Sequence, residues 1–413
     1  MQQPTESTPV FGAFQFHPIE ETLQQFQWFS QMRANQPVFY NELARCWQVF
    51  SYADAQRVIT DYQNFSSEAI PGFSEDTFLS DTIVAKDPPL HRKLRNLVNL
   101  AFTPRAVDQL SGRIKQITQE LLDAVLPRGR MDVVSDIAFP LPAKAIALLL
   151  GVPDEDWDIF RRWASGPQSV GKPQSVDKPQ GAPSASSQED ALRSFLVMEQ
   201  EMSNYFADLL AARRRSPRGD LISALSVAEI DGVRLSESEL LNFCILLLAA
   251  GQDTTKNLIA NAIYCFTEYP DLREQLIQEP DLVPLAIEEV LRYLPPVWFT
   301  FRRAKTAVKL GGQHIPENAI IQVWNASANY DAAMFADPER FDLRREPNRH
   351  LTFGHGIHFC VGAPLARLEA RIALPMMLAQ LKQMQRVPSV PIIVNSGLVY
   401  VIQSLPITFQ ARA

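Results

Sequence analysis

Hydrophobic residues recur at helical spacing along most of the chain. Apolar positions three and four residues apart, without internal proline, predict long amphipathic helices over Ser111–Val125, Ala191–Arg215 and Ser236–Phe266. Ser236 and Glu239 have the spacing of a capping box, which would start the last of these helices. We therefore expect a chain that is mainly helical.

The segments that predict β-strands are shorter than the predicted helices. Val308–Leu310 and His314–Ile315 flank a glycine pair, a pattern typical of a β-hairpin, and further candidates are Ile320–Trp324 and Tyr400–Gln410. These segments do not alternate regularly with helices. The pattern therefore favours a mainly α (α+β) fold with small antiparallel sheets over a doubly wound βαβ fold.

One segment, residues 166–187, differs from the rest in composition. Proline, glycine and serine supply 12 of its 22 residues, and a six-residue unit beginning at Pro167 repeats at Pro173. Two and a half copies are too few to stack into a repeat structure. We interpret the segment as a flexible insertion, of the kind that can lie inside one domain as a lid.

Charge and cysteine content narrow the function classes. Lys and Arg number 39 against 46 Asp and Glu, and a net charge of −7 is unsuited to nucleic-acid binding. The four cysteines form no C-x-x-C pair, and this usage is typical of a reducing cytoplasm, where we expect the protein. The apolar run Cys244–Gly251 is far too short to span a membrane. No dinucleotide or P-loop sequence occurs.

The most informative stretch is Leu351–Glu369. Glycines 354, 356 and 362 surround Cys360, and a helical pattern begins at about this cysteine. Cys360 would therefore lie just before or at a helix N-terminus, where the helix dipole and free N–H groups favour a thiolate. Small neighbours would let a large flat cofactor approach the backbone.

Three chemistries are open for this cysteine. It can be a buried structural residue, which is the ordinary case for a lone cysteine. It can bind zinc, because His350, His355, His358 and Cys360 lie within 11 residues, although the second ligand pair of a usual zinc site is missing. It can also ligate haem iron as a thiolate.

The stretch resembles the haem-binding loop of the cytochrome P-450 family, Phe-x-x-Gly-x-x-x-Cys-x-Gly. Phe353, Gly356, Cys360 and Gly362 match every fixed position. The resemblance covers the chain from about residue 20 onward. It implies a single domain over residues 1–413, with the fold of this family: a helix-rich triangular prism with small antiparallel sheets and a buried haem b. Cys360 would be the iron ligand, and Phe353, Gly354 and Gly362 would contact the haem.

Leu285–Leu294 is a short helical stretch with two possible ion pairs. Arg292 is three residues after Glu289 and four after Glu288, so either acid can reach it. An exposed pair of this kind contributes only a few tenths of a kcal/mol. The segment resembles the family's Glu-x-x-Arg element, which implies a structural network of Glu289, Arg292 and a third member, Arg340.

Polar residues follow the apolar run inside one predicted helix. Asp253 and Thr254 would be costly to bury without a use, and Thr254 would reach the Ala250 carbonyl four residues earlier. The segment resembles the family's oxygen-activation motif. Asp253 and Thr254 would then be the catalytic acid–alcohol pair that delivers protons, while Ala250 and Gly251 would line the groove over the haem.

His91 and Arg95 stand one turn apart on a helix that follows two prolines. On sequence alone the pattern favours a solvated basic helix end over a binding site. The resemblance implies that both bind a haem propionate, with Arg302 and His358 as further partners, because charge-assisted hydrogen bonds suit carboxylates.

The resemblance also implies a substrate pocket. Its residues would be Ile83, Val84, Val297, Trp298, Phe299, Leu398 and Val399. Ordinary core packing is an equal alternative for each of them. Because most of these side chains are apolar, the expected substrate is a medium-sized lipophilic molecule such as a fatty acid, terpenoid, steroid or polyketide.

The implied activity is that of a haem-thiolate monooxygenase, which hydroxylates or epoxidises its substrate, with a place in secondary metabolism. The chain has no flavin or iron–sulfur motif. Electrons would therefore come from a ferredoxin or flavodoxin with its NAD(P)H-dependent reductase. That donor would dock on a basic face of the protein formed by Arg92, Lys93, Arg95, Arg105, Arg113 and Arg371. We expect the protein to be a monomer.

Two other functions are open. A peroxide-driven haem-thiolate peroxygenase would need no electron donor, and a non-enzymatic haem sensor would need no substrate. Neither requires the acid–alcohol pair Asp253 and Thr254, and this is why the monooxygenase is preferred.

Overall fold

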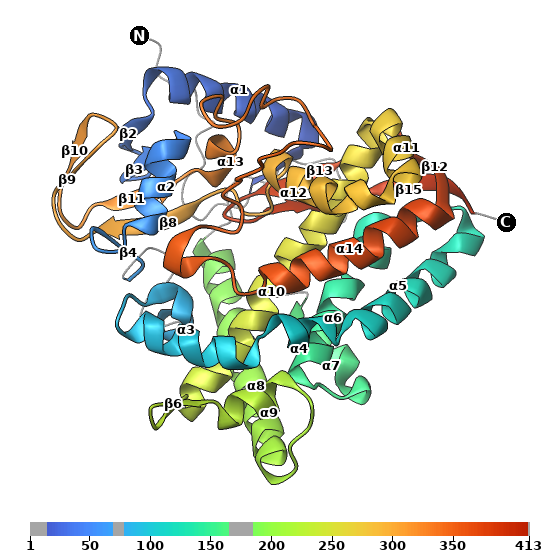
Figure 1. Ribbon diagram of the computed structural model, residues 1–413, viewed down its shortest axis with the longest axis horizontal. Helices are drawn as coiled ribbons and strands as arrows, with labels where there is room; N and C mark the ends of the chain where they lie inside the picture. Colours follow the sequence, from blue (N-terminus) through green and yellow to red (C-terminus); the bar gives the residue numbers. More distant parts are fainter. Residues whose placement is uncertain (1–14, 69–77, 165–184, 412–413) are drawn as a thin grey trace.

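The computed structural model describes residues 15–68, 78–164 and 185–411, and Figure 1 shows how the helices and sheets are arranged. The longer helices are α1 (Ile19–Asn35), α2 (Tyr52–Thr60), α3 (Leu90–Ala101), α5 (Ser111–Val125), α6 (Pro140–Leu150), α7 (Trp157–Ala164), α8 (Ala185–Arg215), α10 (Glu237–Glu268), α11 (Pro270–Gln278), α12 (Val283–Tyr293) and α14 (Ala363–Gln380). Shorter ones are α4 (Pro104–Asp108), α9 (Leu221–Val227) and α13 (Asn325–Ala328).

Helix α10 is the central element. It passes through the middle of the molecule and packs against α6, α8, α12 and α14 (Figure 1). The predicted capping box is confirmed, because the Ser236 hydroxyl accepts from the N–H of Glu239 and the Glu239 carboxylate accepts from the N–H of Ser236. Nearly every side chain of α10 beyond Gly251 is buried, so this helix holds its residues in fixed positions.

The strands form small sheets, as predicted. The largest contains β2 (Val38–Asn41), β3 (Cys46–Val49), β11 (Ile320–Val323), β8 (Thr300–Ala304) and β4 (Phe65–Ser66) in that order. Others are β1 (Gln15–Pro18) with β13 (Ile393–Ser396) and β14 (Tyr400–Ile402), and β12 (Leu381–Arg386) with β15 (Pro406–Ala411) and β5 (Arg130–Asp132). All pairings are antiparallel in the described residues except β3 with β11, which is parallel.

Two hairpins complete the set of strands. The predicted one is confirmed as β9 (Val308–Leu310) and β10 (Gln313–Ile315), and Gly311 and Gly312 adopt the left-handed conformation that its turn requires. The other hairpin is β6 (Glu229–Ile230) with β7 (Val233–Arg234). The predicted strand Tyr400–Gln410 is two strands, β14 and β15, which belong to different sheets.

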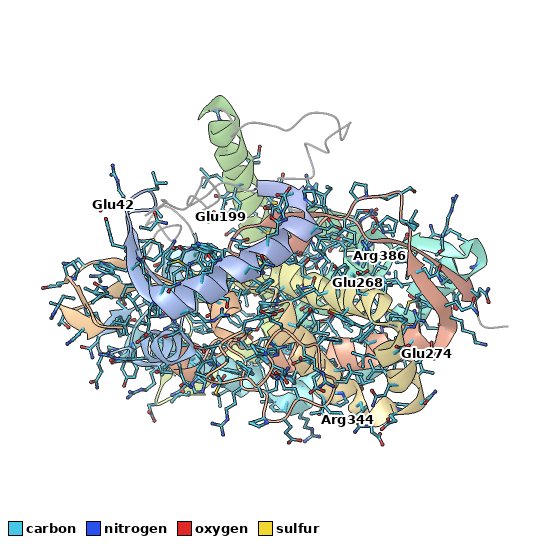
Figure 2. All side chains as sticks on the ribbon, turned by 90° about the horizontal axis from the view of Figure 1, so that it is seen from above. Glu42, Glu199, Glu268, Glu274, Arg344 and Arg386 are labelled. Carbon is cyan, nitrogen blue, oxygen red and sulfur yellow. The ribbon has the colours of Figure 1, made fainter. Side chains whose placement is uncertain are left out.

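One hydrophobic cluster extends from Ile19 to Phe409 and joins α10 to the surrounding helices. A second cluster lies under the five-stranded sheet and contains Val49, Ile321 and Val323. At the far end of α10, Glu268 pairs with Arg386 of β12 at 2.6 Å, and the two side chains lie side by side in Figure 2. The helix is therefore fixed to a sheet at that end.

Residues 166–184 of the predicted insertion lie outside the described residues, and residues 185–187 begin α8. This helix therefore starts six residues earlier than the predicted Ala191. No helix in the described ranges combines the length and the apolarity that a membrane crossing needs.

Candidate active site

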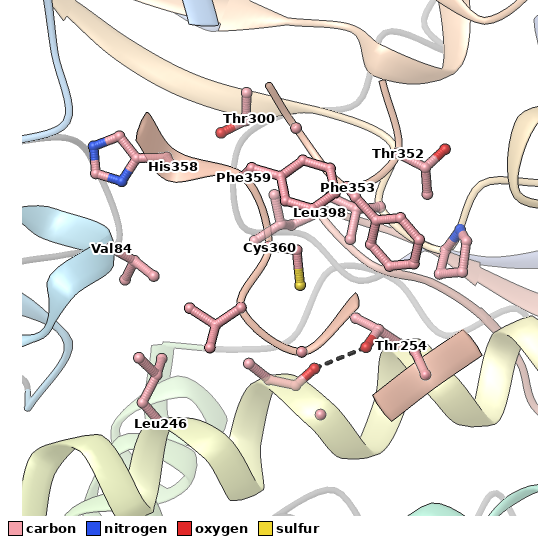
Figure 3. A pocket seen from close by; sticks show the side chains of 18 of the residues that line it. Val84, Leu246, Thr254, Thr300, Thr352, Phe353, His358, Phe359, Cys360 and Leu398 are labelled. Atoms are coloured by element: carbon pink, nitrogen blue, oxygen red, sulfur yellow. Dashed lines mark hydrogen bonds between the residues drawn. The ribbon is translucent and has the colours of Figure 1, made fainter. Parts of the chain in front are cut away.

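A cavity of about 630 Å³ lies between α10, the loop before α14 and the five-stranded sheet. Figure 3 shows Cys360 on that loop and Thr254 on the facing helix α10. Apolar side chains supply most of the wall on the α10 side: Leu79, Ile83, Val84, Phe243, Leu246, Leu247, Val297, Phe299 and Leu398. The cavity is therefore shaped for an apolar occupant with a reactive group on one side.

The backbone of the cysteine loop turns Cys360 into this cavity. Its N–H donates to the Phe353 carbonyl at 2.9 Å, and Gly354 and Gly356 adopt left-handed conformations that strain any other residue. Helix α14 begins at Ala363, so Cys360 lies just before the helix N-terminus, as predicted. The side chain contacts the cavity rather than the hydrophobic core, which contradicts the structural-cysteine alternative.

The electrostatics of Cys360 favour the neutral thiol, whereas a place before a helix N-terminus was expected to favour the thiolate. Burial raises the pKa of the Cys360 thiol, and hydrogen bonds from the N–H groups of Gly362 and Ala363 oppose that rise only in part. A thiolate in this position therefore needs a cation as a partner. In the described part of the chain no three metal-binding side chains converge on a site, and His350 bonds to Glu288 at 3.1 Å. The zinc alternative thus has no support there.

Four basic side chains line one end of the cavity. They are His91, Arg95, Arg302 and His358. His91 is buried, which contradicts the solvated-helix-end alternative for that residue, while Arg95 is half-buried; Arg302 is also buried. The Arg302 guanidinium donates to the Phe301 carbonyl at 2.7 Å and weakly to the Thr300 hydroxyl at 3.4 Å, both neutral acceptors.

The two histidines of this group have rings 4.2 Å apart, and the Nε2 of His91 has no hydrogen-bond partner among the described residues. Burial lowers the pKa of His91 to about 4 and that of His358 to about 2, and it lowers the pKa of Arg302 to about 10. Neighbouring cations add to the effect on both histidines. This end of the cavity is therefore suited to a ligand that brings carboxylates.

Thr254 faces the cavity, and its hydroxyl donates to the Ala250 carbonyl at 2.8 Å, as predicted (dashed line in Figure 3). Ala250 and Gly251 also line the cavity. A Cβ on Gly251 would lie 2.7 Å from the Ile146 Cδ1 of α6, so close packing against that helix also favours glycine here. Asp253 is not part of the cavity wall. Its carboxylate pairs with Lys256 at 2.6 Å.

The Glu289–Arg292 pair is confirmed as a two-bond contact, with both hydrogen bonds 2.8 Å long. Both side chains are fully buried, which contradicts the exposed-pair alternative. Glu288 instead bonds Arg367 of α14 twice at 2.7 Å. Helix α12 is therefore linked through Glu288 to the helix that follows the cysteine loop.

The prediction of Arg340 as the third member of this network is wrong. The side chain that reaches Glu289 is that of Arg345, whose Nε lies 3.1 Å from both carboxylate oxygens. Arg340 contributes only its backbone carbonyl, which accepts from Arg292 and Arg345. The chain turns between these two arginines, so that the later one points inward.

Of the predicted pocket residues, Ile83, Val84, Val297, Phe299 and Leu398 line the cavity. Trp298 and Val399 do not. In extended backbone neighbouring side chains point to opposite sides, and Trp298 accordingly stacks on Tyr400 in the core at 5.0 Å between ring centres.

Phe243, Leu246 and Leu247 of the wall were not predicted. They precede Ala250 by seven, four and three residues on α10, so helical spacing alone could have identified them.

A sulfur aimed into an apolar cavity, a cluster of basic side chains at one end and a threonine on the facing helix are the features expected of a haem-dependent monooxygenase, an oxidoreductase. The family model described as cytochrome P-450 matches residues 189–409. The chain belongs to the cytochrome P-450 family.

The chain is also similar to individual proteins of this family. The chain is 39% identical over 389 residues to the putative cytochrome P-450 YjiB of Bacillus subtilis (strain 168), covering 93% of this chain and 94% of that one. It is 39% identical over 370 residues to the cyclomarin C epoxidase CymV of Salinispora arenicola (strain CNS-205), covering 89% and 91%. The crystal structure of CYP109E1 from Bacillus megaterium with testosterone superposes with a TM-score of 0.83 at 36% identity, covering 93% and 98%.

The cofactor of this family is haem b, and the residues of the site fit it. Cys360 would supply the thiolate ligand that the iron requires. A Cβ on Gly362 would lie 3.8 Å from the Cys360 sulfur, so glycine leaves that side of the sulfur open. The unpartnered His91 nitrogen and the Arg302 guanidinium, which has only neutral acceptors, match the two propionates. The predicted haem contacts Phe353, Gly354 and His358 also line the cavity.

Replacing Arg302 with leucine should speed haem loss about ten- to hundredfold, because charge-assisted hydrogen bonds contribute about 1.5–3 kcal/mol each. The measurement is the rate of haem transfer to excess apomyoglobin. Arg303→Leu is the matched control, since Arg303 is the next residue of β8 and donates instead to Asn318 at 2.7 Å. Equal rates for the two variants would contradict the assignment of Arg302.

Proposed function

We propose that this monooxygenase activates dioxygen with externally supplied electrons and hydroxylates or epoxidises a medium-sized lipophilic molecule. The observation that carries the proposal is the cavity itself. Its wall on the α10 side is mostly apolar, and Thr254 and Cys360 face the cavity from opposite sides. Similarity to an epoxidase, and to a structure that holds the steroid testosterone, supports a lipophilic substrate.

The haem, when bound through Cys360, supplies the oxygen chemistry, and the thiolate favours cleavage of the O–O bond. The residues of this chain bind and orient the substrate and move protons. Val84, Val297 and Leu398 exclude water from the substrate side. The Thr254 hydroxyl holds a proton next to the Ala250 carbonyl, and Asp253, whose side chain is 48% exposed, exchanges protons with solvent. Asp253 and Thr254 are thus the proposed catalytic pair.

The proposed electron donor is a ferredoxin or flavodoxin with its reductase. Arg92, Arg105, Arg113 and Arg371 are exposed on α3, α4, α5 and α14, and Phe359 next to Cys360 is also exposed. Such a mixed basic and apolar surface suits a small acidic protein. Arg95 is left out of this docking surface because it lines the cavity, where it donates to the Phe359 carbonyl at 2.7 Å. We also propose that the whole chain forms one domain, which the larger of the two core clusters supports because it joins residues from Ile19 to Phe409.

Replacing Thr254 with alanine should uncouple electron consumption from product formation, because it removes the hydroxyl that holds the proton. With a ferredoxin and its reductase, NAD(P)H consumption should continue while product per NAD(P)H falls about a hundredfold, the lower end of one general-acid contribution. Product and hydrogen peroxide are measured together. The control is Thr267→Ala, which removes a similar hydroxyl–backbone bond from α10 away from the cavity.

Unchanged coupling in the Thr254→Ala variant would contradict the proton route. Turnover with peroxide, combined with no turnover with any electron donor, would instead identify a peroxygenase.

A further inference from the structure

Lys256 is an unusual residue of α10. It follows Thr254 by two positions, and only 11% of its side chain is exposed. A lysine ammonium removed from water to this degree is costly unless an anion accompanies it. The Asp253 carboxylate is that anion, with Oδ1 2.6 Å from the Lys256 Nζ.

This pair directs Asp253 along the helix toward its C-terminal end. The Thr254 hydroxyl is directed the other way, to the Ala250 carbonyl one turn back. The acid and the alcohol of the catalytic pair are thus each engaged with a different partner. The ion pair with Lys256 therefore competes with any contact between the Asp253 carboxylate and the Thr254 hydroxyl.

A further polar group lies one turn beyond Asp253. Asn257 is completely buried, and neither its Oδ1 nor its Nδ2 has a hydrogen-bond partner within the described residues. Residues four apart on a helix are neighbours. A buried amide with two unsatisfied atoms is a typical position for an internal water molecule. Asn257 therefore offers a polar contact to an Asp253 carboxylate that has left Lys256, either directly or through water.

We propose that Lys256 is a positioning residue for proton delivery. Its ammonium holds Asp253 away from Thr254 and so limits how often the acid passes a proton toward the cavity. This inference rests on the proposed function, since it assigns a control element to the same proton route. It predicts that loss of the amino group accelerates a reaction that loss of the acid slows.

The test compares Lys256→Met, Lys256→Arg, Asp253→Asn and the double variant Asp253→Asn/Lys256→Met as holoproteins. Methionine has a similar length and suits a buried position, and arginine keeps the ion pair. In Lys256→Met, substrate-dependent NAD(P)H consumption should rise about two- to fivefold, the factor by which a partly exposed ion pair favours the closed arrangement. Its solvent deuterium isotope effect should fall. Lys256→Arg should behave as the parent, and Lys256→Met should have no effect in the Asp253→Asn background.

A second readout does not depend on turnover. The C–O stretching band of the reduced carbon monoxide complex reports the polar groups above the haem. The band should shift or split in Lys256→Met, and the change should be absent when Lys256→Met is compared within the Asp253→Asn background. Thermal midpoints within a few degrees of the parent show that the variants are folded.

Two outcomes would overturn the inference. If Lys256→Met slows the reaction as much as Asp253→Asn, the lysine takes part in the relay rather than restraining it. If both the rate and the infrared band are unchanged, Lys256 has no positioning role. Failure of the proposed function is recognised separately, because Thr254→Ala would then leave coupling intact whatever Lys256→Met does to the band.

Discussion

Replacing Cys360 with serine is expected to abolish monooxygenation and the red-shifted Soret band of the reduced carbon monoxide complex. A serine hydroxyl does not ionise near neutral pH and is a poor ligand for iron, so the thiolate contribution to O–O cleavage disappears. We expect product formation to fall to the level of a mixture without enzyme. The backbone that presents residue 360 should be unaffected, because the N–H bond to the Phe353 carbonyl does not involve the side chain.

The matched control is Cys46→Ser. Cys46 is buried in β3, and its sulfur lies 3.9 Å from Oε1 of Gln322, a contact that a serine hydroxyl can also make. This variant should keep both the band and the activity. A red-shifted band that survives in Cys360→Ser would show that another group ligates the iron.

Replacing Glu289 with glutamine should destabilise the protein by about 3–5 kcal/mol, the usual cost of leaving a buried charge without its partner. Arg292 and Arg345 would both lose their carboxylate, and Arg292 is completely buried. Backbone carbonyls of Asn329 and Pro338 would still accept from Arg292, but they carry no compensating charge. The measurement is the free energy of unfolding from urea titration followed by circular dichroism.

Glu279→Gln is the control for this prediction. Glu279 also pairs with one arginine, Arg344, but both side chains are about half exposed, so water replaces the lost partner. We expect a far smaller change in the free energy of unfolding. If the two variants prove equally stable, the Glu289 network is not a main source of stability.

Local patterns in the sequence predicted most of the fold. The capping box of α10, the glycine turn between β9 and β10 and the helical spacing of α5 depend on residues close together in the chain, and all three are confirmed. The Thr254 bond to Ala250 is of the same kind. Short-range geometry is sufficient in each case, because one helix or one turn determines the contact.

The wrong predictions from the sequence concern contacts between distant segments, or the direction in which a single side chain points. Arg340 and Arg345 are both arginines in one irregular stretch, and only the folded chain determines which one points at Glu289. The family resemblance led us to expect Trp298 at the cavity together with Val297 and Phe299, yet alternation in extended backbone turns it to the opposite side. The pairing of Asp253 with Lys256 is local, but the sequence did not indicate that this lysine would be buried.

The basic end of the cavity should affect the lifetime of the protein in the cell. Arg302 is buried and Arg95 half-buried, and the hydrogen-bond acceptors of both guanidinium groups are neutral carbonyl and hydroxyl oxygens, so two propionates would add compensating negative charge when haem binds. A ligand that binds only the native state stabilises that state in proportion to the logarithm of its free concentration. The amount of intact protein should therefore follow the supply of haem, and chains made during haem shortage should be degraded sooner than those made when haem is abundant.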